Sequence, residues 1–207
     1  MAASPERAGV VPATAGNIRC AAERARAGEL ILVPTETVYG VAARADSAEA
    51  LARLYAAKGR DEAKRVAFFA ADLAAVRAAG AQVDAIAERL AEAFWPGPLT
   101  MVLLNAAGGW DGFRVPDHPV ALAWVRELDF LPAVTSANRA GDPPALTAQE
   151  AWNALAPHVS LALDAGPAPG GMASTVVRVK DGAVELLREG PIGRDALAAA
   201  AACAIRG

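Results

Sequence analysis

The segment Leu30-Ile31-Leu32-Val33-Pro34-Thr35-Glu36-Thr37-Val38-Tyr39-Gly40 joins a short apolar run to a polar turn. The run Leu30–Val33 shows no alternation of apolar and polar side chains, which indicates a strand buried on both faces. The hydroxyls of Thr35 and Thr37 follow as soon as Pro34 ends the strand. Because the carboxyl ends of strands border the ligand crevice in α/β sheets, this turn is a candidate binding loop.

Helices with recognisable start signals flank this strand. Ser47 caps a helix over Ser47–Ala57, because its hydroxyl can accept an amide hydrogen bond from the first turn. Thr147 and Glu150 fit the capping box of a helix that runs to about Ala156. Helical spacing of apolar residues predicts five further helices, over Ala15–Ala27, Asp72–Ala79, Asp84–Phe94, Pro119–Leu128 and Arg194–Ala204.

Strands alternate with these helices. Apolar runs predict strands over Val66–Ala70, Leu99–Leu104 and Ala133–Thr135. Ser174–Val179 and Ala183–Arg188 predict a hairpin, because the Asp-Gly pair between them readily takes the positive φ angles of a type I′ turn. Alternating helices and strands that end in a hairpin indicate an α/β fold with a mixed parallel and antiparallel sheet.

The composition limits the classes of protein to which the chain can belong. Its 207 residues favour a single domain. The net charge of −3 argues against a surface made for polyanions, and no apolar run approaches the roughly 20 residues of a membrane-spanning helix. Two distant cysteines exclude a disulfide scaffold and a cysteine-ligated zinc ribbon. We therefore expect a soluble cytoplasmic protein with no membrane partner.

The two histidines give no support to nucleophilic or metal-histidine catalysis. His118 lies between Asp117 and Pro119, and His158 follows Pro157 near the end of a predicted helix. No Gly-x-Ser-x-Gly nucleophile elbow accompanies either of them. We expect both histidines to lie in surface loops.

Polar residues gather instead at the ends of predicted elements. Lys58 and Arg60 end a helix, where cations complement the negative end of the helix dipole. Ser136 and Asn138 follow a short strand, where they could form local turn bonds. Arg188 ends the hairpin and could be a solvated charge. Each of these residues has a purely structural interpretation when it is taken alone.

These blocks are more informative together than singly. Seven of them, in order along the chain, resemble the YrdC/Sua5 family: Pro34–Gly40, Lys58-x-Arg60, Trp95–Thr100, Arg114-Val115-Pro116, Thr135–Asn138, Ser174–Val177 and Arg188-x-Gly190. The resemblance covers about residues 15–192. It implies one YrdC-like domain over residues 1–207 without the C-terminal Sua5 domain of longer members. It also implies a twisted mixed sheet with flanking helices around a deep open cavity.

Members of that family are L-threonylcarbamoyladenylate synthases. The resemblance therefore implies an enzyme, a nucleotidyltransferase, that joins L-threonine, bicarbonate and ATP into threonylcarbamoyl-AMP and pyrophosphate. Mg²⁺ is expected to travel with the ATP phosphates rather than in a protein cage. The product feeds the t6A modification of tRNA, in which downstream transferase proteins act, and binding of tRNA or double-stranded RNA is a further implied property.

The resemblance also assigns roles to individual residues. It places a catalytic group around the nucleotide phosphates and the reacting carbamate: Lys58, Arg60, Ser136 and Asn138. Two more residues would complete the ATP site, Thr100 and Arg188. Threonine would be held by Thr35, Arg114 and Ser174. An arginine is suited to the threonine carboxylate because its planar fork matches a carboxylate better than an ammonium does.

The segment 61–69 departs from the family pattern. Phe69 stands where a substrate-side histidine is common, so an apolar wall would replace a hydrogen-bonding group. Two alternatives stay open. One is a family paralogue that binds RNA or nucleotide without making the adenylate, and the other is a carbamoyl-adenylate enzyme for a different amino acid or acceptor. Adenylate formation with threonine, compared with other acceptors, separates them.

Overall fold

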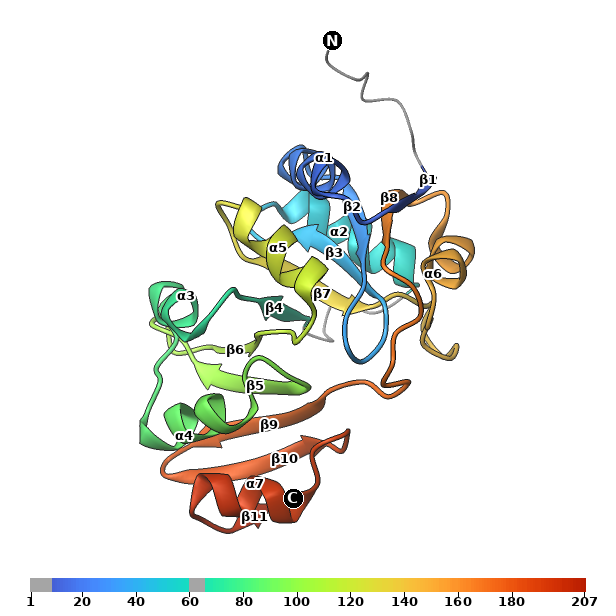
Figure 1. Ribbon diagram of the computed structural model, residues 1–207. Coiled ribbons are helices and arrows are strands. Elements are labelled where there is room, and N and C mark those ends of the chain that lie inside the picture. Colours follow the sequence, from blue (N-terminus) through green and yellow to red (C-terminus); the bar gives the residue numbers. More distant parts are fainter. Residues whose placement is uncertain (1–8, 60–65) are drawn as a thin grey trace.

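The computed structural model describes residues 9–59 and 66–207, so Arg60 and the atypical residues 61–65 lie outside the described residues. The described chain forms eleven strands: β1 (Gly9–Pro12), β2 (Leu30–Val33), β3 (Gly40–Arg44), β4 (Ala67–Phe69), β5 (Leu99–Leu104), β6 (Trp110–Arg114), β7 (Pro132–Ser136), β8 (Val159–Asp164), β9 (Thr175–Lys180), β10 (Ala183–Arg188) and β11 (Ile205–Arg206). They form one sheet in the order β1-β8-β2-β3-β7-β4-β6-β5-β9-β10-β11 (Figure 1).

The sheet is mixed. Strand β2 pairs in parallel with β8 and antiparallel with β3, which itself runs antiparallel to β7. Beyond β7, the parallel pairs β4–β6 and β5–β9 alternate with antiparallel pairs. The α/β fold with a mixed parallel and antiparallel sheet, predicted from the sequence, is confirmed.

Helices cover the sheet in the described residues: α1 (Ala15–Arg26), α2 (Ala48–Lys58), α3 (Leu73–Ala78), α4 (Ala85–Phe94), α5 (Pro119–Glu127), α6 (Ala148–Leu155) and α7 (Arg194–Ala201). Helix α1 packs against α5, and α4 packs against α7. Figure 1 shows α1, α2, α5 and α6 around the half of the sheet that holds β2 and β3, and α3, α4 and α7 around the half with β5, β9 and β10. None of these helices is long and apolar enough to cross a bilayer.

The local start and turn signals act as the sequence predicts. The hydroxyl of Ser47 accepts an amide hydrogen bond from the first turn of α2. Thr147 and Glu150 complete both halves of the capping box of α6. Asp181 and Gly182 have φ angles of 50° and 70° and join β9 to β10, as a type I′ turn requires.

Five strands differ from the expectation, since β1, β3, β6, β8 and β11 occur where the sequence predicts none. Strand β3 reads Gly-Val-Ala-Ala-Arg, and glycine and alanine are poor strand formers. Its conformation is therefore decided by pairing with β2 on one side and β7 on the other. The final helix ends at Ala201 rather than Ala204, because Ala202 takes a positive φ of 52° and turns the chain into β11.

One of the two histidines also differs from the expectation. His118 is the N-cap of α5, and its Nδ1 accepts a hydrogen bond from the amide of Val120 at 3.2 Å. The ring is half-buried, and burial lowers its pKa, although the carboxylates of Glu36 and Asp117 act in the opposite direction. His158 is exposed, as predicted.

Side chains alternate between the two faces of the middle strands, and this alternation positions the site. On β5, Met101 is buried in the apolar core that α4 covers, whereas Thr100 and Val102 face a cavity on the other side. On β6, Phe113 belongs to the same core and Arg114 lines the cavity. The sheet thus separates a packed apolar layer from an open polar one.

Candidate functional site

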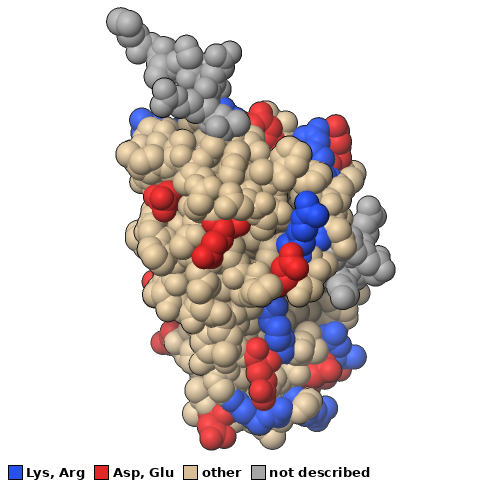
Figure 2. Space-filling view, turned by 90° about the vertical axis from the view of Figure 1, so that its right-hand side faces the viewer, with Lys and Arg blue, Asp and Glu red and all other residues tan. Residues whose placement is uncertain are grey.

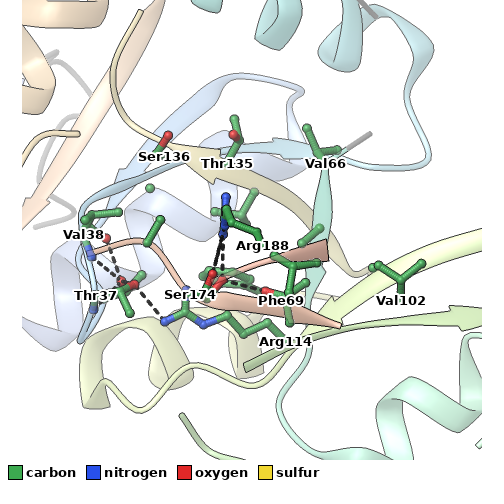
Figure 3. A pocket seen from close by; sticks show the side chains of 18 of the residues that line it. Thr37, Val38, Val66, Phe69, Val102, Arg114, Thr135, Ser136, Ser174 and Arg188 are labelled. Carbon is green, nitrogen blue, oxygen red and sulfur yellow. Dashed lines mark hydrogen bonds between the residues drawn. The ribbon is translucent and has the colours of Figure 1, made fainter. Parts of the chain in front are cut away.

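A cavity of about 240 Å³ lies on the open face of the sheet, and Figure 3 shows its walls from close by. Seven neighbouring strands, from β3 through β7, β4, β6, β5 and β9 to β10, each contribute at least one lining residue. Residues of the loop 34–39, Val66 and residues 173–174 complete the lining. The curved sheet therefore gathers segments that are far apart in the sequence around one space.

The hydroxyl of Thr35 makes most of the side-chain hydrogen bonds within the loop between β2 and β3, and main-chain hydrogen bonds tie the loop to Gly171 and Ala145. Oγ1 of Thr35 accepts hydrogen bonds from the amides of Thr37 and Val38, at 3.1 and 3.2 Å, and donates to the carbonyl of Val38 at 2.6 Å. Its single proton is then used, so Oγ1 of Thr37, 2.8 Å away, is the donor between the two hydroxyls. Thr35 fixes the loop, and Thr37 keeps lone pairs for another donor.

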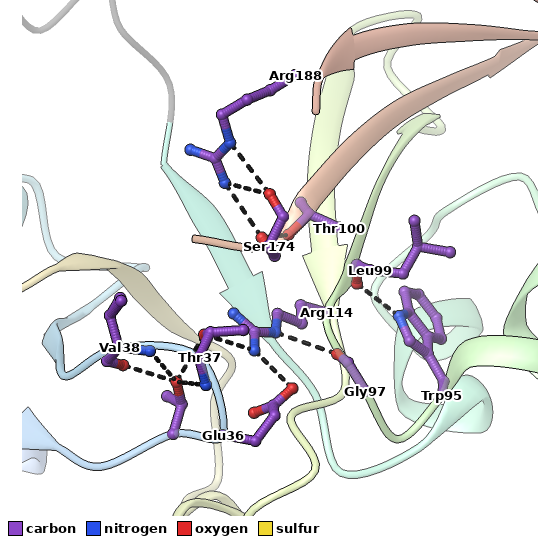
Figure 4. Close-up of polar contacts among 11 residues, drawn as sticks. Glu36, Thr37, Val38, Trp95, Gly97, Leu99, Thr100, Arg114, Ser174 and Arg188 are labelled. Atoms are coloured by element: carbon purple, nitrogen blue, oxygen red, sulfur yellow. Dashed lines mark hydrogen bonds and ion pairs between the residues drawn. The ribbon is translucent and has the colours of Figure 1, made fainter. Parts of the chain in front are cut away.

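That donor is Arg114, which is buried at the end of β6. Figure 4 shows its contacts: Nε donates to the carbonyl of Gly97 at 3.2 Å, and Nη2 donates to Oε1 of Glu36 at 2.6 Å and to Oγ1 of Thr37 at 2.9 Å. The ring of Phe69 lies against the guanidinium, with its centroid 5.6 Å from Cζ. Among the described residues Nη1 has no hydrogen-bond partner, so one arm of a fixed guanidinium remains for a ligand.

A second arginine, Arg188, also lines the cavity. Arg188 lies at the end of β10, and its Nε and Nη2 donate to the carbonyl of Ser174 at 3.1 and 2.7 Å. Nη2 also donates to Oγ of Ser174 at 3.2 Å, and this oxygen lies 2.8 Å from Oγ1 of Thr100 on β5. Figure 3 shows Ser174 between Arg188 and Arg114. One wall of the cavity therefore presents a hydroxyl between two cations.

Lys58 joins the end of α2 to the turn after β7. Its Nζ donates to the carbonyl of Ser136 at 2.5 Å and to Oδ1 of Asn138 at 3.2 Å. Lys58 and Asn138 are both buried, and the side-chain amide of Asn138 donates to the carbonyls of Arg139 and Asp142. Of Lys58, Ser136 and Asn138, Ser136 alone lines the cavity. The ammonium supports the wall that presents Ser136 and places a positive charge behind it.

One end of the cavity is apolar. Val66, Val102 and Trp110 line it, and Figure 3 shows Val66 and Val102 on the side away from Thr37. The guanidinium of Arg178 lies over the Trp110 ring, 5.5 Å from its centroid. An apolar wall with a flat aromatic ring is suited to a planar group such as a nucleotide base.

The cavity unites most of the residues that the sequence singles out. Phe69 lines it, as expected of an apolar wall. Lys58 and Asn138 lie behind it, and Arg60 lies outside the described residues. Six predicted site residues line it: Thr35, Thr100, Arg114, Ser136, Ser174 and Arg188.

Glu36 is the residue that sequence reasoning missed. It pairs with Arg114, a residue 78 positions further along the chain, so no local pattern reveals the contact. The available signal was a single carboxylate in a loop made otherwise of apolar and hydroxyl side chains.

The charges at the cavity are positive. Arg114 and Arg188 line it, and no acidic side chain does so among the described residues. Burial lowers the pKa of the Arg114 guanidinium and the Glu36 carboxylate raises it, yet an arginine keeps its proton in proteins. The described residues also contain no cluster of three or more histidines, cysteines, aspartates or glutamates that could hold a metal ion. Hydroxyls between fixed cations are suited to phosphate and carboxylate groups.

The family model for Sua5, YciO and YrdC proteins, which carries the description "Telomere recombination", matches residues 23–190. The chain belongs to this family. A relative from Mycobacterium tuberculosis, provisionally named a threonylcarbamoyl-AMP synthase, is 36% identical over 182 residues, which cover 84% of this chain and 83% of that one. The threonylcarbamoyl-AMP synthase of Bacillus subtilis is 33% identical, with 86% of this chain and 55% of that protein covered. The family expected from the sequence is confirmed.

Solved structures agree with this assignment. Sua5 of Pyrococcus abyssi in complex with L-threonine superposes with a TM-score of 0.86 at 29% identity, over 92% of this chain and 59% of that one. YciO of Escherichia coli has a TM-score of 0.78 at 24% identity and covers 88% of this chain and 93% of its own, which shows a shared fold. The chain thus spans less than two thirds of the Bacillus and Pyrococcus relatives.

Proposed function

We propose that this chain is an L-threonylcarbamoyladenylate synthase that uses L-threonine, bicarbonate and ATP. The observation that carries the proposal is the pair of fixed arginines, Arg114 and Arg188, which line one cavity with hydroxyls between them. A carboxylate and a triphosphate are the anionic groups of the two larger substrates, and two separate cations can receive them. The names of the relatives from Mycobacterium and Bacillus agree with this activity.

Threonine would bind at the end of the cavity that holds Arg114. Nη1 of Arg114 would bind the carboxylate, because it is the arm of the guanidinium that no described residue uses. The hydroxyl of Ser174 lies beside it and can accept or donate a further hydrogen bond. Thr35 would act by holding the loop, since its own proton is committed to Val38.

ATP would lie along the remaining length of the cavity. Its phosphates would contact Arg188 and Ser136, with the charge of Lys58 behind Ser136 and with Asn138 holding that lysine. Arg60 would add a further cation there by resemblance. Thr100 would contact the nucleotide, and the base would occupy the apolar end near Trp110. Because the lining offers no carboxylate in the described chain, Mg²⁺ would enter on the phosphates themselves.

The chemistry then needs positioning more than a protein nucleophile. The amine of threonine combines with bicarbonate, loses water and becomes a carbamate. A carbamate oxygen attacks the α-phosphorus of ATP, the bond to the β-phosphate oxygen breaks, and pyrophosphate leaves. Negative charge grows on the transferred phosphoryl group, where fixed cations and hydroxyl donors stabilise it. The residues at the cavity supply such groups.

Two substitutions test the assignment of the two ends. Arg114→Lys should raise the KM for threonine by about tenfold, because an ammonium cannot keep the bonds to Gly97, Glu36 and Thr37 while it binds a carboxylate. Arg188→Ala should raise the KM for ATP by about tenfold and leave the KM for threonine within about twofold. Pyrophosphate release measures both. Equal effects of each substitution on both KM values would contradict the assignment.

The finer partners belong to the same proposal. In a role in t6A modification, the chain would act in the cytoplasm beside downstream transferase proteins. Binding of tRNA or double-stranded RNA stays a prediction, and Figure 2 shows basic and acidic side chains interspersed on the face in view. Salt-dependent retention of tRNA without ATP consumption would favour the RNA-binding paralogue instead.

A further inference from the structure

Glu36 and Arg114 form an ion pair behind the wall of the cavity. Oε1 of Glu36 lies 2.6 Å from Nη2 of Arg114, and the two side chains are 15% and 6% exposed. Glu36 does not line the cavity itself, so a ligand meets its charge only through the arginine. Its second oxygen, Oε2, is buried and has no hydrogen-bond partner among the described residues. Among the described residues, Arg114 is therefore the hydrogen-bond partner of this carboxylate, which also acts on the more distant His118 through its charge.

The pair makes the amino-acid end of the cavity electrically neutral. A ligand with one carboxylate and one ammonium adds no net charge to it. A ligand with the carboxylate alone adds one negative charge a few ångströms from Glu36, in a place where solvent screens little. An uncompensated charge in such surroundings is costly. Without Glu36, the same place would carry the single positive charge of Arg114 and would favour the anionic ligand.

We propose that Glu36 is a specificity-determining residue, which makes the site select an amino acid over the matching hydroxy acid by cancelling the charge of Arg114. The proposal rests on the proposed function, in which Arg114 binds the threonine carboxylate. It adds a role for a residue that touches no substrate. Glu36 disfavours ligands that bind Arg114 through a carboxylate but carry no ammonium, although the cavity as a whole is cationic.

The test compares two ligands of the same shape. L-Threonine has an ammonium, and 2,3-dihydroxybutanoate of matching configuration has a hydroxyl in its place. Their dissociation constants are measured on the full chain by titration calorimetry, with competition between the two as a check that they share the site. The measured quantity is the dissociation constant of the hydroxy acid divided by that of threonine.

The charge of residue 36 should set this ratio. Glu36→Gln keeps the shape of the side chain and removes its charge, so the ratio should fall by about tenfold. Glu36→Asp withdraws the charge by one methylene and should lower the ratio by a smaller factor. Thr37→Val removes the hydrogen bond to Arg114 without a change of charge, so it should weaken both ligands alike and leave the ratio as it is.

A structural role alone would give a different result. If Glu36 merely positioned Arg114, then Glu36→Gln would weaken both ligands equally and the ratio would not move, which would overturn the proposal. If Glu36→Gln does not fold, an unchanged ratio in Glu36→Asp overturns it equally. Glu29→Gln, which breaks the ion pair with Arg24, is the matched control and should leave the ratio unchanged.

Failure of the underlying assignment is recognised separately. If Arg114→Lys leaves threonine binding intact, then Arg114 does not hold the carboxylate, and both the assignment and this proposal fail. If Arg114→Lys weakens threonine binding and the ratio stays constant in both Glu36 variants, only the role of Glu36 fails.

Discussion

The ammonium nitrogen of Lys58 lies 2.5 Å from the main-chain oxygen of Ser136, which joins the last turn of α2 to a strand at the edge of the cavity. The charge of a lysine that is only 3% exposed needs hydrogen-bond acceptors to offset the cost of burial, and here Asn138 supplies a second acceptor. The same contact therefore fixes the wall that presents Ser136 and places a positive charge behind this wall.

Lys58→Met should remove both effects at once. The methionine keeps the aliphatic stem but removes the lysine donor from Oδ1 of Asn138 and from the main-chain oxygen of Ser136, which retains the amide of Asn138; the loss costs about 1–3 kcal/mol of unfolding free energy. Threonine-dependent pyrophosphate release should fall by about a hundredfold or more. Lys180→Met, at an exposed lysine of the hairpin, is the control and should change neither quantity. Near-normal turnover in Lys58→Met would show that the ammonium plays no part in the reaction.

Phe69 and Phe68 are neighbours on β4 with opposite surroundings. Phe69 lines the cavity against Arg114, whereas Phe68 packs with Phe113 in the core on the other face. Phe69→His should raise the KM for threonine by about fivefold, because a smaller, polar imidazole replaces the phenyl ring that lies against the arginine. Phe68→His should lower the melting temperature and leave the KM for threonine unchanged. Steady-state kinetics of both variants decide the matter, and an unaltered KM in Phe69→His would contradict a role for Phe69 at the amino-acid end.

Gly190 allows the chain after β10 to cross the start of β9. A Cβ atom at this position would lie 2.3 Å from the amide nitrogen of Thr175 and 2.7 Å from the carbonyl oxygen of Ala173, which forces the backbone apart beside Ser174. Gly190→Ala should therefore lower stability by about 1–3 kcal/mol and reduce activity. Gly16→Ala, in α1 with no atom closer than 3.9 Å to the added carbon, should raise stability by about 0.5–1 kcal/mol and leave activity unchanged. Denaturant unfolding and activity assays measure both variants. Equal unfolding free energies of the two variants would contradict the prediction that the close passage of the chain at Gly190 requires a glycine.

The titration of His118 should make stability depend on pH. Burial lowers its pKa in the folded state, so the unfolded chain binds the proton more readily. The contribution of His118 to the free energy of unfolding is complete above about pH 6.5, the ordinary pKa of histidine. It is lost as the pH falls from there through the lower pKa of the folded state. His118→Asn keeps a capping side chain for α5 and cannot titrate, so its unfolding free energy should vary less over that window. His158→Asn is the control, and identical pH profiles of wild type and His118→Asn would contradict the prediction.

The fold could be predicted where local chemistry decides the structure. Ser47, Thr147 and the Asp181-Gly182 turn act through neighbours within a few residues, and the structure confirms all three. Strand β3 could not be predicted because its glycine and alanines favour no strand by themselves. Its hydrogen bonds come from β2, the strand just before it, and from β7, which lies far along the chain.

The site, like the fold, has features that the sequence predicts and features that depend on distant contacts. The hydroxyls and cations at the ends of elements are visible in the sequence, and six of those residues line one cavity. The partners that fix them are not visible, because Glu36 reaches Arg114 across 78 positions and Lys58 reaches Ser136 across the same number. Sequence reasoning also gave Thr35 a hydroxyl for the substrate, whereas the structure uses that hydroxyl within its own loop.

Mass detection of the adenylate tests the central proposal most directly. The wild-type chain is incubated with ATP, L-threonine and isotopically labelled bicarbonate, and the products are separated and identified by mass spectrometry. The account predicts threonylcarbamoyl-AMP that carries the label, with one pyrophosphate released for each molecule formed, and a loss of both in Lys58→Met. Hydrolysis of ATP without a threonine-containing adenylate, or no reaction at all with every substrate present, would contradict it.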